Sequence, residues 1–212
     1  MIPYKISQMW LGSPETRPTH LMNTWRDKNP KCEYVVWTPE ELQHIDFHNQ
    51  AQIDATKEFS GKCDIMRYEL LHRYGGFFVD ADTECVNELD DFFFKNDRFT
   101  CYDNELATGN LISFDLINPA FMGCKSGDLL FDLIILEISK MKKINHPAWI
   151  QTGPRMFTDV CQRWQHLYPM KIYPSWYFIG TSHGNGVDYT GTDKVYSKHY
   201  YGSAYNLYGK LK

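Results

Sequence analysis

The segment 63–84 (CDIMRYELLHRYGGFFVDADTE) constrains the fold more than any other part of the chain. Its first half carries apolar residues at helical spacing, and the pair Gly75-Gly76 that follows predicts the end of a helix. The apolar run 77–79 consists of bulky, β-forming residues and predicts a short buried strand. A helix, a tight turn and a buried strand in this order indicate an α/β fold.

Two acidic residues, Asp80 and Asp82, follow this strand directly. In an extended chain, residues two apart point to the same side, so both carboxylates are expected on one face of the strand end. No basic residue lies between them, so they repel each other unless a cation intervenes, and oxygen ligands suit Mg²⁺ or Mn²⁺, which also bind phosphates. A solvated acidic turn has the same local pattern. The buried strand and the helix before it favour the metal site.

The helix of this segment carries Asp64 and Arg67 one turn apart, so both side chains can reach the same side. A surface ion pair has this spacing as well, and such a pair would contribute little to stability. Apolar residues flank both positions and instead predict a helix packed against the sheet. The pair is therefore expected beside the sheet and not on a free surface.

The rest of the chain alternates between strand-like and helix-like patterns, which is typical of a mostly parallel sheet flanked by helices. Strands are predicted at 4–10, 34–37, 77–79, 99–102 and 110–114. Helices are predicted at 19–28, 63–74 and 129–142, and two further helices are predicted to begin at 38 and at 153. The turn 152–155 that opens the last helix predicts either a plain N-cap or an anion site. From 173 onwards the chain is rich in glycine and aromatic residues and predicts loops that fold over a site.

Length, composition and charge restrict the class of protein. The 212 residues suffice for one sizeable α/β domain. Hydrophobic residues at 43% and aromatic residues at 16% exclude a disordered chain and provide for a well-filled core. The formal net charge of −4 and the lack of any basic run argue against a nucleic-acid partner.

The cysteines and the apolar stretches predict a cytoplasmic protein without a membrane segment. The six cysteines are dispersed and form no C-x-x-C pair, so neither a zinc site nor a disulfide framework is indicated. The start, MIPYKISQMWLG, lacks the pattern of a signal peptide. The longest apolar stretch, 129–138, is interrupted by Asp132 and Glu137 and is too short to span a bilayer. Any membrane anchor would lie outside these residues.

Three patches of the sequence resemble a known family. The block of helix, Gly-Gly, strand and D-x-D resembles the signature of glycosyltransferases of the capsular-polysaccharide and initiating-mannosyltransferase type (family 32). The opening PYKISQMWLG resembles that family's first strand, I-P-K-x-I-H-Q-x-W, and 196–204 (YSKHYYGSA) resembles its closing H-x-x-G-S-W. The resemblance covers most of the chain and is specific at 2–12, 63–84 and 196–205. The whole chain also resembles virus-encoded glycosyltransferase domains that modify capsid protein, which implies the host cytoplasm as the location.

The resemblance implies a fold and an activity. The fold is a single GT-A domain over 1–212, with a nucleotide- and metal-binding half at 1–90 and an acceptor-side half at 91–212 that ends in a closing loop region. The activity is the metal-dependent transfer of a hexose from a UDP-sugar to a hydroxyl of a glycan or glycoprotein acceptor, with Mn²⁺ or Mg²⁺ as cofactor.

The family's metal and donor-sugar residues carry over to the D-x-D block and the C-terminal region. Asp80, Asp82 and His199 would bind the metal, and Asp64 and Arg67 would orient the donor sugar. Asp64, Arg67 and Asp82 are thus the expected catalytic residues.

The nucleotide contacts carry over less directly. Gln8, Trp10 and Gly12, in the loop after the first strand, would receive the base, although Trp10 is equally compatible with a core position. Lys198 would neutralise the diphosphate. His199 is also compatible with a structural role, and His183 competes with it for the metal or diphosphate.

Departures from the family pattern affect individual contacts. Phe78 stands where the family usually has Tyr, Ala204 where it has the terminal Trp, and Ser7 where it has His. An inverting reaction would also need a general base, for which Asp188, Asp115 and Glu105 are candidates by chemistry.

Two other classes of protein remain as alternatives. The first is a haloacid-dehalogenase-type phosphatase that uses Asp80, whose D-x-D motif usually continues to Thr or Val where Glu84 stands here. The second is a non-catalytic carbohydrate-binding module, suggested by the many Tyr and Trp residues.

Overall fold

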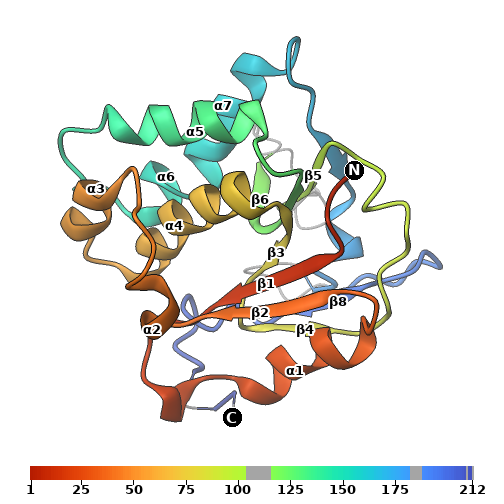
Figure 1. Cartoon of the computed structure of the whole chain (residues 1–212). Helices are drawn as coiled ribbons and strands as arrows, with labels where there is room; N and C mark the ends of the chain where they lie inside the picture. The colour runs from red at the N-terminus through yellow and green to blue at the C-terminus, as the bar shows by residue number, and fades with distance from the viewer. Residues whose placement is uncertain (104–115, 182–187, 209, 212) are drawn as a thin grey trace.

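The computed structural model describes residues 1–103, 116–181, 188–208, 210 and 211. Its larger sheet has six strands in the order β2-β1-β3-β6-β5-β7. These strands are β1 (Lys5–Met9), β2 (Glu33–Trp37), β3 (Gly76–Val79), β5 (Arg98–Tyr102), β6 (Ile117–Cys124) and β7 (Lys171–Tyr173). Strand β6 is antiparallel to both of its neighbours, whereas the pairs of β1 with β2, β1 with β3 and β5 with β7 are parallel. The predicted mixed, mostly parallel α/β sheet is confirmed (Figure 1).

The α-helices and 3₁₀-helices occupy the segments between these strands. They are η1 (Pro14–Thr16), α1 (Thr19–Lys28), α2 (Pro39–Leu42), α3 (Gln50–Ala55), α4 (Phe59–Tyr74), α5 (Leu129–Ser139), α6 (Ala148–Gln151), α7 (Pro154–Trp164) and η2 (Ser175–Tyr177). None of the helices in the described part of the chain is long and apolar enough to cross a membrane. All six cysteines are free thiols, and four of them are buried.

Strand β3 separates the two main apolar clusters of the core. Its side chains alternate between faces, so Phe78 packs with α4, α5 and α7, while Phe77 and Val79 pack with Trp25 of α1 and with Phe178. Because both faces of the strand are covered, every residue of β3 is buried, as its continuous apolar run predicts. The end of β3 is therefore held firmly from both sides.

Helix α4 packs on the sheet and ends as predicted. Gly75 caps it with a φ of 66°, a conformation that favours glycine, and its N–H donates to the Leu71 carbonyl. The helix begins at Phe59, one turn earlier than the apolar pattern indicates. Asp64 and Arg67 are buried on it beside apolar residues.

Three sequence predictions about the secondary structure were wrong. The strand before the D-x-D ends at Val79, so Asp80 is already outside it and Asp82 lies in a turn, in which the Thr83 hydroxyl donates to the Asp80 carbonyl at 2.6 Å. Strand β6 runs through Asn118-Pro119, where we predicted no strand, and a register shift of β5 accommodates it. Helix α5 ends at Ser139, and Leu129 and Leu136 of the predicted apolar side are exposed. The strand predicted at 110–114 lies outside the described residues.

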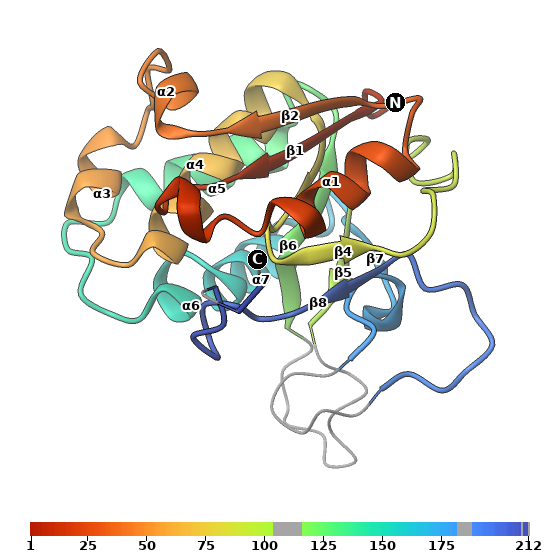
Figure 2. The same ribbon diagram turned by 90° about the horizontal axis from the view of Figure 1, so that it is seen from below.

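A two-stranded antiparallel ribbon joins the middle of the chain to its C-terminal region. It consists of β4 (Thr83–Cys85) and β8 (Ser197–His199), with Thr83 opposite His199. The Trp25 indole N–H of α1 donates to the Thr83 hydroxyl at 2.9 Å, which fixes the ribbon to the same side of the sheet as α1 (Figure 2). The C-terminal segment thereby lies next to the end of β3.

Candidate functional site

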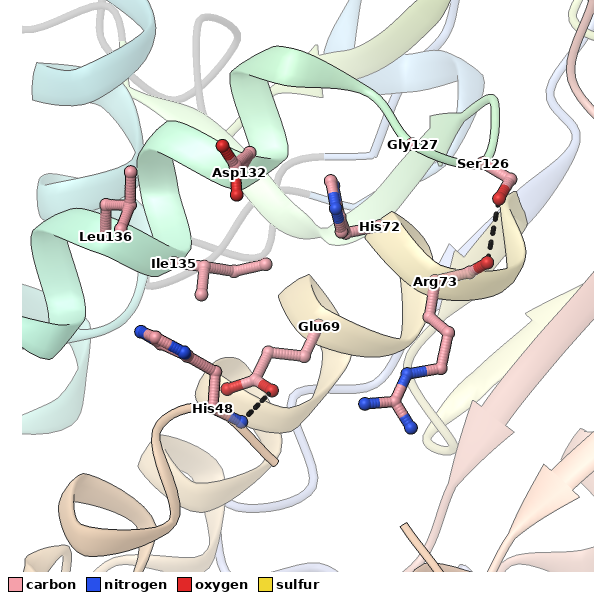
Figure 3. Close-up of a pocket in the computed structure, with 9 residues that line it drawn as sticks. All are labelled: His48, Glu69, His72, Arg73, Ser126, Gly127, Asp132, Ile135 and Leu136. Atoms are coloured by element: carbon pink, nitrogen blue, oxygen red, sulfur yellow. Dashed lines mark hydrogen bonds between the residues drawn. The ribbon is translucent and has the colours of Figure 1, made fainter. Parts of the chain in front are cut away.

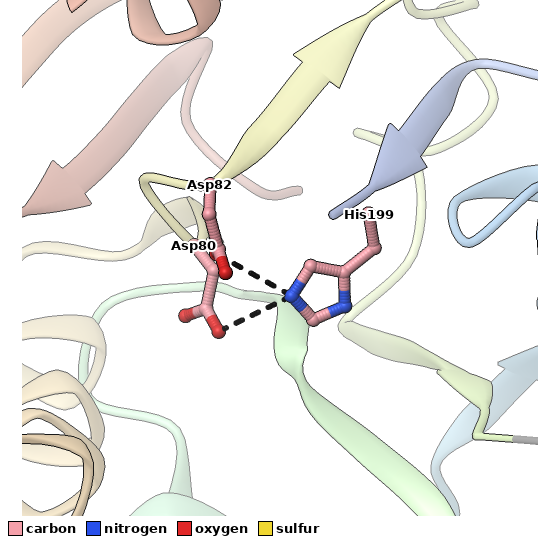
Figure 4. Close-up of side chains that lie close together, drawn as sticks. All are labelled: Asp80, Asp82 and His199. Carbon is pink, nitrogen blue, oxygen red and sulfur yellow. Dashed lines mark ion pairs between the residues drawn. The ribbon is translucent and has the colours of Figure 1, made fainter. Parts of the chain in front are cut away.

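Asp80, Asp82 and His199 form a cluster at the end of β3 (Figure 4). The His199 Nε2 atom lies 3.4 Å from Asp82 Oδ1 and 3.9 Å from Asp80 Oδ2. One ligand atom from each residue lies within 4.8 Å of the other two. Although the two acids leave the strand, the turn still directs both carboxylates to one point, as predicted.

The β4–β8 ribbon is what brings His199 to the acidic turn. Its register sets His199 opposite Thr83, the residue after Asp82. The Tyr200 N–H donates to the Asp82 carbonyl at 3.0 Å, and the Gly202 N–H donates to Asp82 Oδ2 at 2.6 Å. Asp82 is thus held by the C-terminal segment on both its backbone and its side chain.

Arg67 connects the cluster to helix α4. Its Nη2 atom lies 2.7 Å from Asp80 Oδ1 and 3.8 Å from Asp64 Oδ1, and its Nη1 donates to the Pro119 carbonyl at 2.8 Å. Asp64 in turn accepts a hydrogen bond from the Thr152 hydroxyl at 3.2 Å. Arg67 and Asp64 are both buried, so the alternative of a surface ion pair is wrong.

Burial and charge shift the ionisation of these groups in different directions. Burial raises the pKa of Asp64 to about 7, against the attraction of Arg67. Burial also acts to raise the pKa of Asp82, but His199 and the Gly202 N–H more than offset it, so that pKa lies below its usual value. Burial disfavours the charged imidazolium and so acts to lower the pKa of His199. The adjacent carboxylates of Asp82 and Asp80 outweigh this effect and raise that pKa overall. The two carboxylates of the cluster therefore favour a positive charge beside them.

The donor atoms of the cluster fit a divalent metal ion. Two carboxylates and one imidazole nitrogen are ligands that Mn²⁺ accepts, and carboxylates suit Mg²⁺. The His199 Nδ1 atom is buried and has no hydrogen-bond partner among the described residues, so nothing there ties the ring to a purely structural role. Asp80 keeps 26% of its side chain exposed and opens the cluster to solvent.

Asp80 and His199 of the cluster line a cavity of about 550 Å³. The cavity draws its walls from α4, β6, α6 and the C-terminal segment. Its lining residues are Glu58, Ser60, Asp64, Arg67, Asp80, Asp103, Leu116, Asn118, Ala120, Ala148, Trp149, Pro154, His199, Tyr201, Ser203 and Ala204. Charged groups thus gather on one side of a space of ligand size.

The three residues predicted to receive a base lie beside the cluster and are largely covered. Gln8 is fully buried: its amide donates to the Asp80 carbonyl at 3.0 Å and accepts from the Tyr34 hydroxyl. Trp10 is buried too, and the Tyr208 ring packs edge-on against it at 5.0 Å. Trp10 also lies against Gly12, where a Cβ would come within 2.9 Å of its ring.

The remaining predicted residues do not join the cluster. Lys198 is exposed, and strand alternation turns its side chain to the face opposite His199. Asp188 bonds to the Thr181 hydroxyl at 2.5 Å and does not line the cavity. Asp115, Glu105 and His183 lie outside the described residues.

Sequence reasoning missed several residues of the site. Thr152 was considered only as a cap or an anion site, and in the structure its hydroxyl holds Asp64. Asp103, which the sequence allows equally as a site residue or as part of a plain loop, lines the cavity and accepts a hydrogen bond from Asn118 at 2.6 Å. The Gly202 N–H donates to Asp82, which precedes it by 120 residues, and no local sequence pattern predicts such a contact.

A second cavity of about 450 Å³ lies near the C-terminal end of α4 (Figure 3). It is lined by polar groups and by helix α5: His48, Glu69, His72, Arg73, Ser126, Gly127, Asp132, Ile135 and Leu136. Both carboxylate oxygens of Glu69 accept backbone N–H groups, from His48 at 2.6 Å and from Asn49 at 2.8 Å. Arg73 donates to the Asp46 carbonyl, also at 2.6 Å.

Comparisons with known proteins agree with the fold and with the D-x-D segment. Residues 16–100 match the family model described as "Glycosyltransferase sugar-binding region containing DXD motif". This range includes Asp64, Arg67, Asp80 and Asp82 and excludes His199.

Two curated relatives and one solved structure are similar to the chain. An uncharacterized glycosyltransferase of Acanthamoeba polyphaga mimivirus is 24% identical over 75% of the chain and 64% of its own length. Inositol phosphoceramide mannosyltransferase 3 of Schizosaccharomyces pombe is 28% identical over 41% of the chain and 23% of its own length. The chain therefore spans less than two thirds of either relative.

The solved structure is a glycosyltransferase involved in the glycosylation of the major capsid of PBCV-1. It superimposes with a TM-score of 0.58 at 9% identity and covers 98% of this chain and 97% of that one. At this identity the similarity establishes the fold, which is that of GT-A glycosyltransferases.

Proposed function

We propose that this chain, which has a GT-A fold and carries the glycosyltransferase sugar-binding region with its DXD motif, is a metal-dependent hexosyltransferase. The donor is a UDP-sugar and the acceptor a hydroxyl group of a glycan or glycoprotein. The observation that carries the proposal is the convergence of Asp80, Asp82 and His199 beside a cavity that Asp64 and Arg67 also line.

The cluster would hold Mn²⁺ or Mg²⁺ through Asp80, Asp82 and the Nε2 atom of His199. When bound, such an ion supplies positive charge to the diphosphate that leaves the sugar. Gly202 N–H and the β4–β8 ribbon hold Asp82 and His199 in position, so these two ligands would need little reorganisation to bind the ion.

Arg67 and Asp64 would bind the donor sugar. Arg67 is fixed by Asp80 and by the Pro119 carbonyl, and it carries its positive charge into the cavity wall. Asp64 is fixed by Thr152 and lines the same wall. A carboxyl group whose pKa is raised to about 7 can either donate or accept a hydrogen bond from a sugar hydroxyl near neutral pH.

The base of the nucleotide is assigned to the loop of Gln8, Trp10 and Gly12, on the resemblance of the first strand to family 32. In the structure Tyr208 packs on the edge of Trp10. A base bound at Trp10 would therefore lie next to Tyr208. Lys198 faces away from His199 and would contact a diphosphate only after its side chain moves across the ribbon.

The proposal also covers the organisation and the location of the protein. The cluster takes Asp80 and Asp82 from the predicted nucleotide half, 1–90, and His199 from the acceptor-side half, 91–212. Six free thiols support a reducing compartment, which we take to be the cytoplasm. The capsid-related fold neighbour makes a viral glycoprotein a reasonable acceptor to test.

A nucleotide screen by thermal shift tests the proposal. UDP, GDP and CMP are added with and without Mn²⁺ to the wild type, to Asp80→Ala and to Asp82→Ala. UDP should raise the Tm of the wild type only with Mn²⁺ and should leave both variants unchanged. Asp54→Ala, at an exposed position of α3, serves as the control and should respond as the wild type does.

Two results would contradict the proposal. Nucleotide stabilisation that persists unchanged in both aspartate variants rules out the metal bridge. A phosphoaspartate trapped at Asp80 favours a phosphatase, although the Arg67 ion pair at 2.7 Å makes this carboxylate a weak nucleophile.

A further inference from the structure

Trp149 is an exposed aromatic residue at the edge of the catalytic cavity. It lies on α6 with 56% of its surface exposed, although Trp is usually mostly buried. It lines the catalytic cavity and also a neighbouring groove of about 580 Å³. Trp149 therefore borders both the space where the reaction would occur and a second space.

The neighbouring groove combines an apolar floor with a charged rim. Met141, Met156 and Val160 supply apolar surface. The rim carries two ion pairs, Arg155 with Asp159 at 3.1 Å and Arg163 with Glu137 at 3.0 Å. Because both signs of charge are present and paired, the groove does not select a strongly anionic surface such as a membrane or a nucleic acid.

A second exposed ring lies on an adjoining segment. Phe59, the first residue of α4, is 62% exposed, and its neighbours Glu58 and Ser60 line the catalytic cavity. The Glu58 carboxylate accepts the N–H of Ala148, the residue before Trp149, at 3.3 Å. Phe59 and Trp149 are the two most exposed aromatic residues in the described part of the chain, and both belong to segments at the mouth of this cavity.

We propose that Trp149 is a platform for a sugar ring of the acceptor, and that the groove of Met141, Met156 and Val160 holds the sugar units that follow. This inference rests on the proposed transferase function and names its acceptor as a glycan chain. A pyranose ring has an apolar C–H face, which stacks on an indole, and a hydroxyl edge, which bonds to paired planar groups such as those of Arg155 and Asp159. An uncharged ligand with many hydroxyl groups fits a rim of paired opposite charges better than an ionic ligand does.

The place of Trp149 fits a linear acceptor that runs from the reacting centre into the groove. A ring that stacks on Trp149 already lies along the wall of the cavity that holds Arg67 and Asp80. The next sugars extend away from the donor into the groove. A single exposed ring that borders both spaces would thus align a linear ligand with the reacting centre.

Nuclear magnetic resonance of ¹⁵N-labelled protein tests this inference. The indole N–H signal of Trp149 is assigned from its loss in Trp149→Ala. Methyl α-glucopyranoside, methyl α-mannopyranoside, maltotriose and mannotriose are then titrated separately. At least one trisaccharide should shift the Trp149 signal, and Trp149→Ala should bind that saccharide about tenfold more weakly.

Two further variants check the specificity of the effect. Trp149→Phe keeps an aromatic face and should retain most of the affinity. Leu167→Ala removes another apolar side chain, 67% exposed, that lines neither space, and should leave the affinity unchanged.

The outcomes separate this inference from the proposed function. Saccharide binding that persists in Asp80→Ala, which should no longer bind nucleotide, supports the platform independently of the metal. The inference is overturned if none of the four saccharides shifts the signal, or if Trp149→Ala binds as tightly as the wild type. It is also overturned if the signal shifts with protein concentration alone, because the surface is then an interface between copies.

Discussion

The two cavities beside helix α4 contain similar residue types and differ in how their charges are paired. The cavity of Figure 3 contains Glu69 and two histidines, and the candidate cavity at the end of β3 contains Asp80 and His199. At about 100° per residue, Glu69 and Arg73 point about 140° and 180° away from Asp64 around the helix axis. One helix thus supplies charged residues to two separate spaces.

In the cavity of Figure 3, polar side chains are bonded to the backbone. Glu69 accepts two N–H groups, Arg73 donates to a carbonyl, and the His72 ring bonds to the Asp128 carbonyl at 3.1 Å. Such pairing stabilises the fold and leaves little capacity for a ligand.

Beside the candidate cavity, the carboxylates of Asp80 and Asp82 converge on the imidazole of His199. The other nitrogen of this ring, His199 Nδ1, lacks a partner among the described residues. The comparison teaches that convergence of like charges, rather than the number of polar residues, distinguishes the candidate site.

Asp82→Asn should have the largest effect of the substitutions proposed here, and that effect should be a loss of activity. It keeps the size of the side chain and the bond from Gly202 while it removes a charge from the cluster. We expect transfer, measured as UDP release, to fall at least about a hundredfold. Glu69→Gln, in the other cavity, should keep the activity of the folded protein. Equal losses in both variants would remove the distinction between the two cavities.

Asp64 should make the stability of the folded protein depend on pH. In the unfolded chain its carboxyl ionises near 3.8, whereas burial raises the pKa to about 7 in the folded protein. Between pH 4 and pH 7 the folded state therefore holds a proton that the unfolded state has lost, so the stability falls as the pH rises. Asp64→Asn removes this term, which is on the order of a few kcal/mol.

Thermal unfolding in the presence of a chelator measures this effect. The Tm of Asp64→Asn relative to the wild type should rise from pH 4 to pH 7. A Tm difference that stays constant across this range would mean that Asp64 is ionised in the folded protein. The electrostatic contrast between the two cavities would then be smaller than we infer.

Glu69→Gln should lower stability. One of its two backbone contacts would lose an acceptor, and a buried N–H without a partner costs about 1–3 kcal/mol. Urea unfolding followed by circular dichroism gives the change in free energy. A loss below the error of the method would show that water replaces the contact, and that this cavity is more open than its bonds indicate.

Ser126→Ala should have the smallest effect. The Ser126 hydroxyl donates to the Arg73 carbonyl at 2.7 Å at an exposed position. We expect a change within about 0.5 kcal/mol in the same unfolding experiment. A larger change would indicate that the rim of this cavity is coupled to its buried glutamate.

Local sequence patterns predicted the elements that carry most of the site. The spacing of Asp64 and Arg67, the glycine cap at Gly75 and the apolar strand before Asp80 depend only on neighbouring residues, and the structure contains all of them. The geometry of the acidic turn was not predictable in this way. The Thr83 side chain bends the chain there, and a β-turn and a strand end have similar composition.

Contacts between distant segments could not be predicted from the residues alone. The pairing of β4 with β8 joins two three-residue strands, which are too short to have a clear pattern. His199 entered the prediction through resemblance to a family. The bond from Thr152 to Asp64 depends on how α6 and α7 pack on α4, which periodicity does not specify.

The β4–β8 ribbon has a consequence for biosynthesis. Asp82 leaves the ribosome long before Gly202, which follows it by 120 residues, so the nascent chain carries its acidic pair without the groups that hold it. A product of premature termination before β8 would retain all six strands of the main sheet and lack the imidazole. The cluster of Asp80, Asp82 and His199 would thus be completed only after β8 has been synthesised.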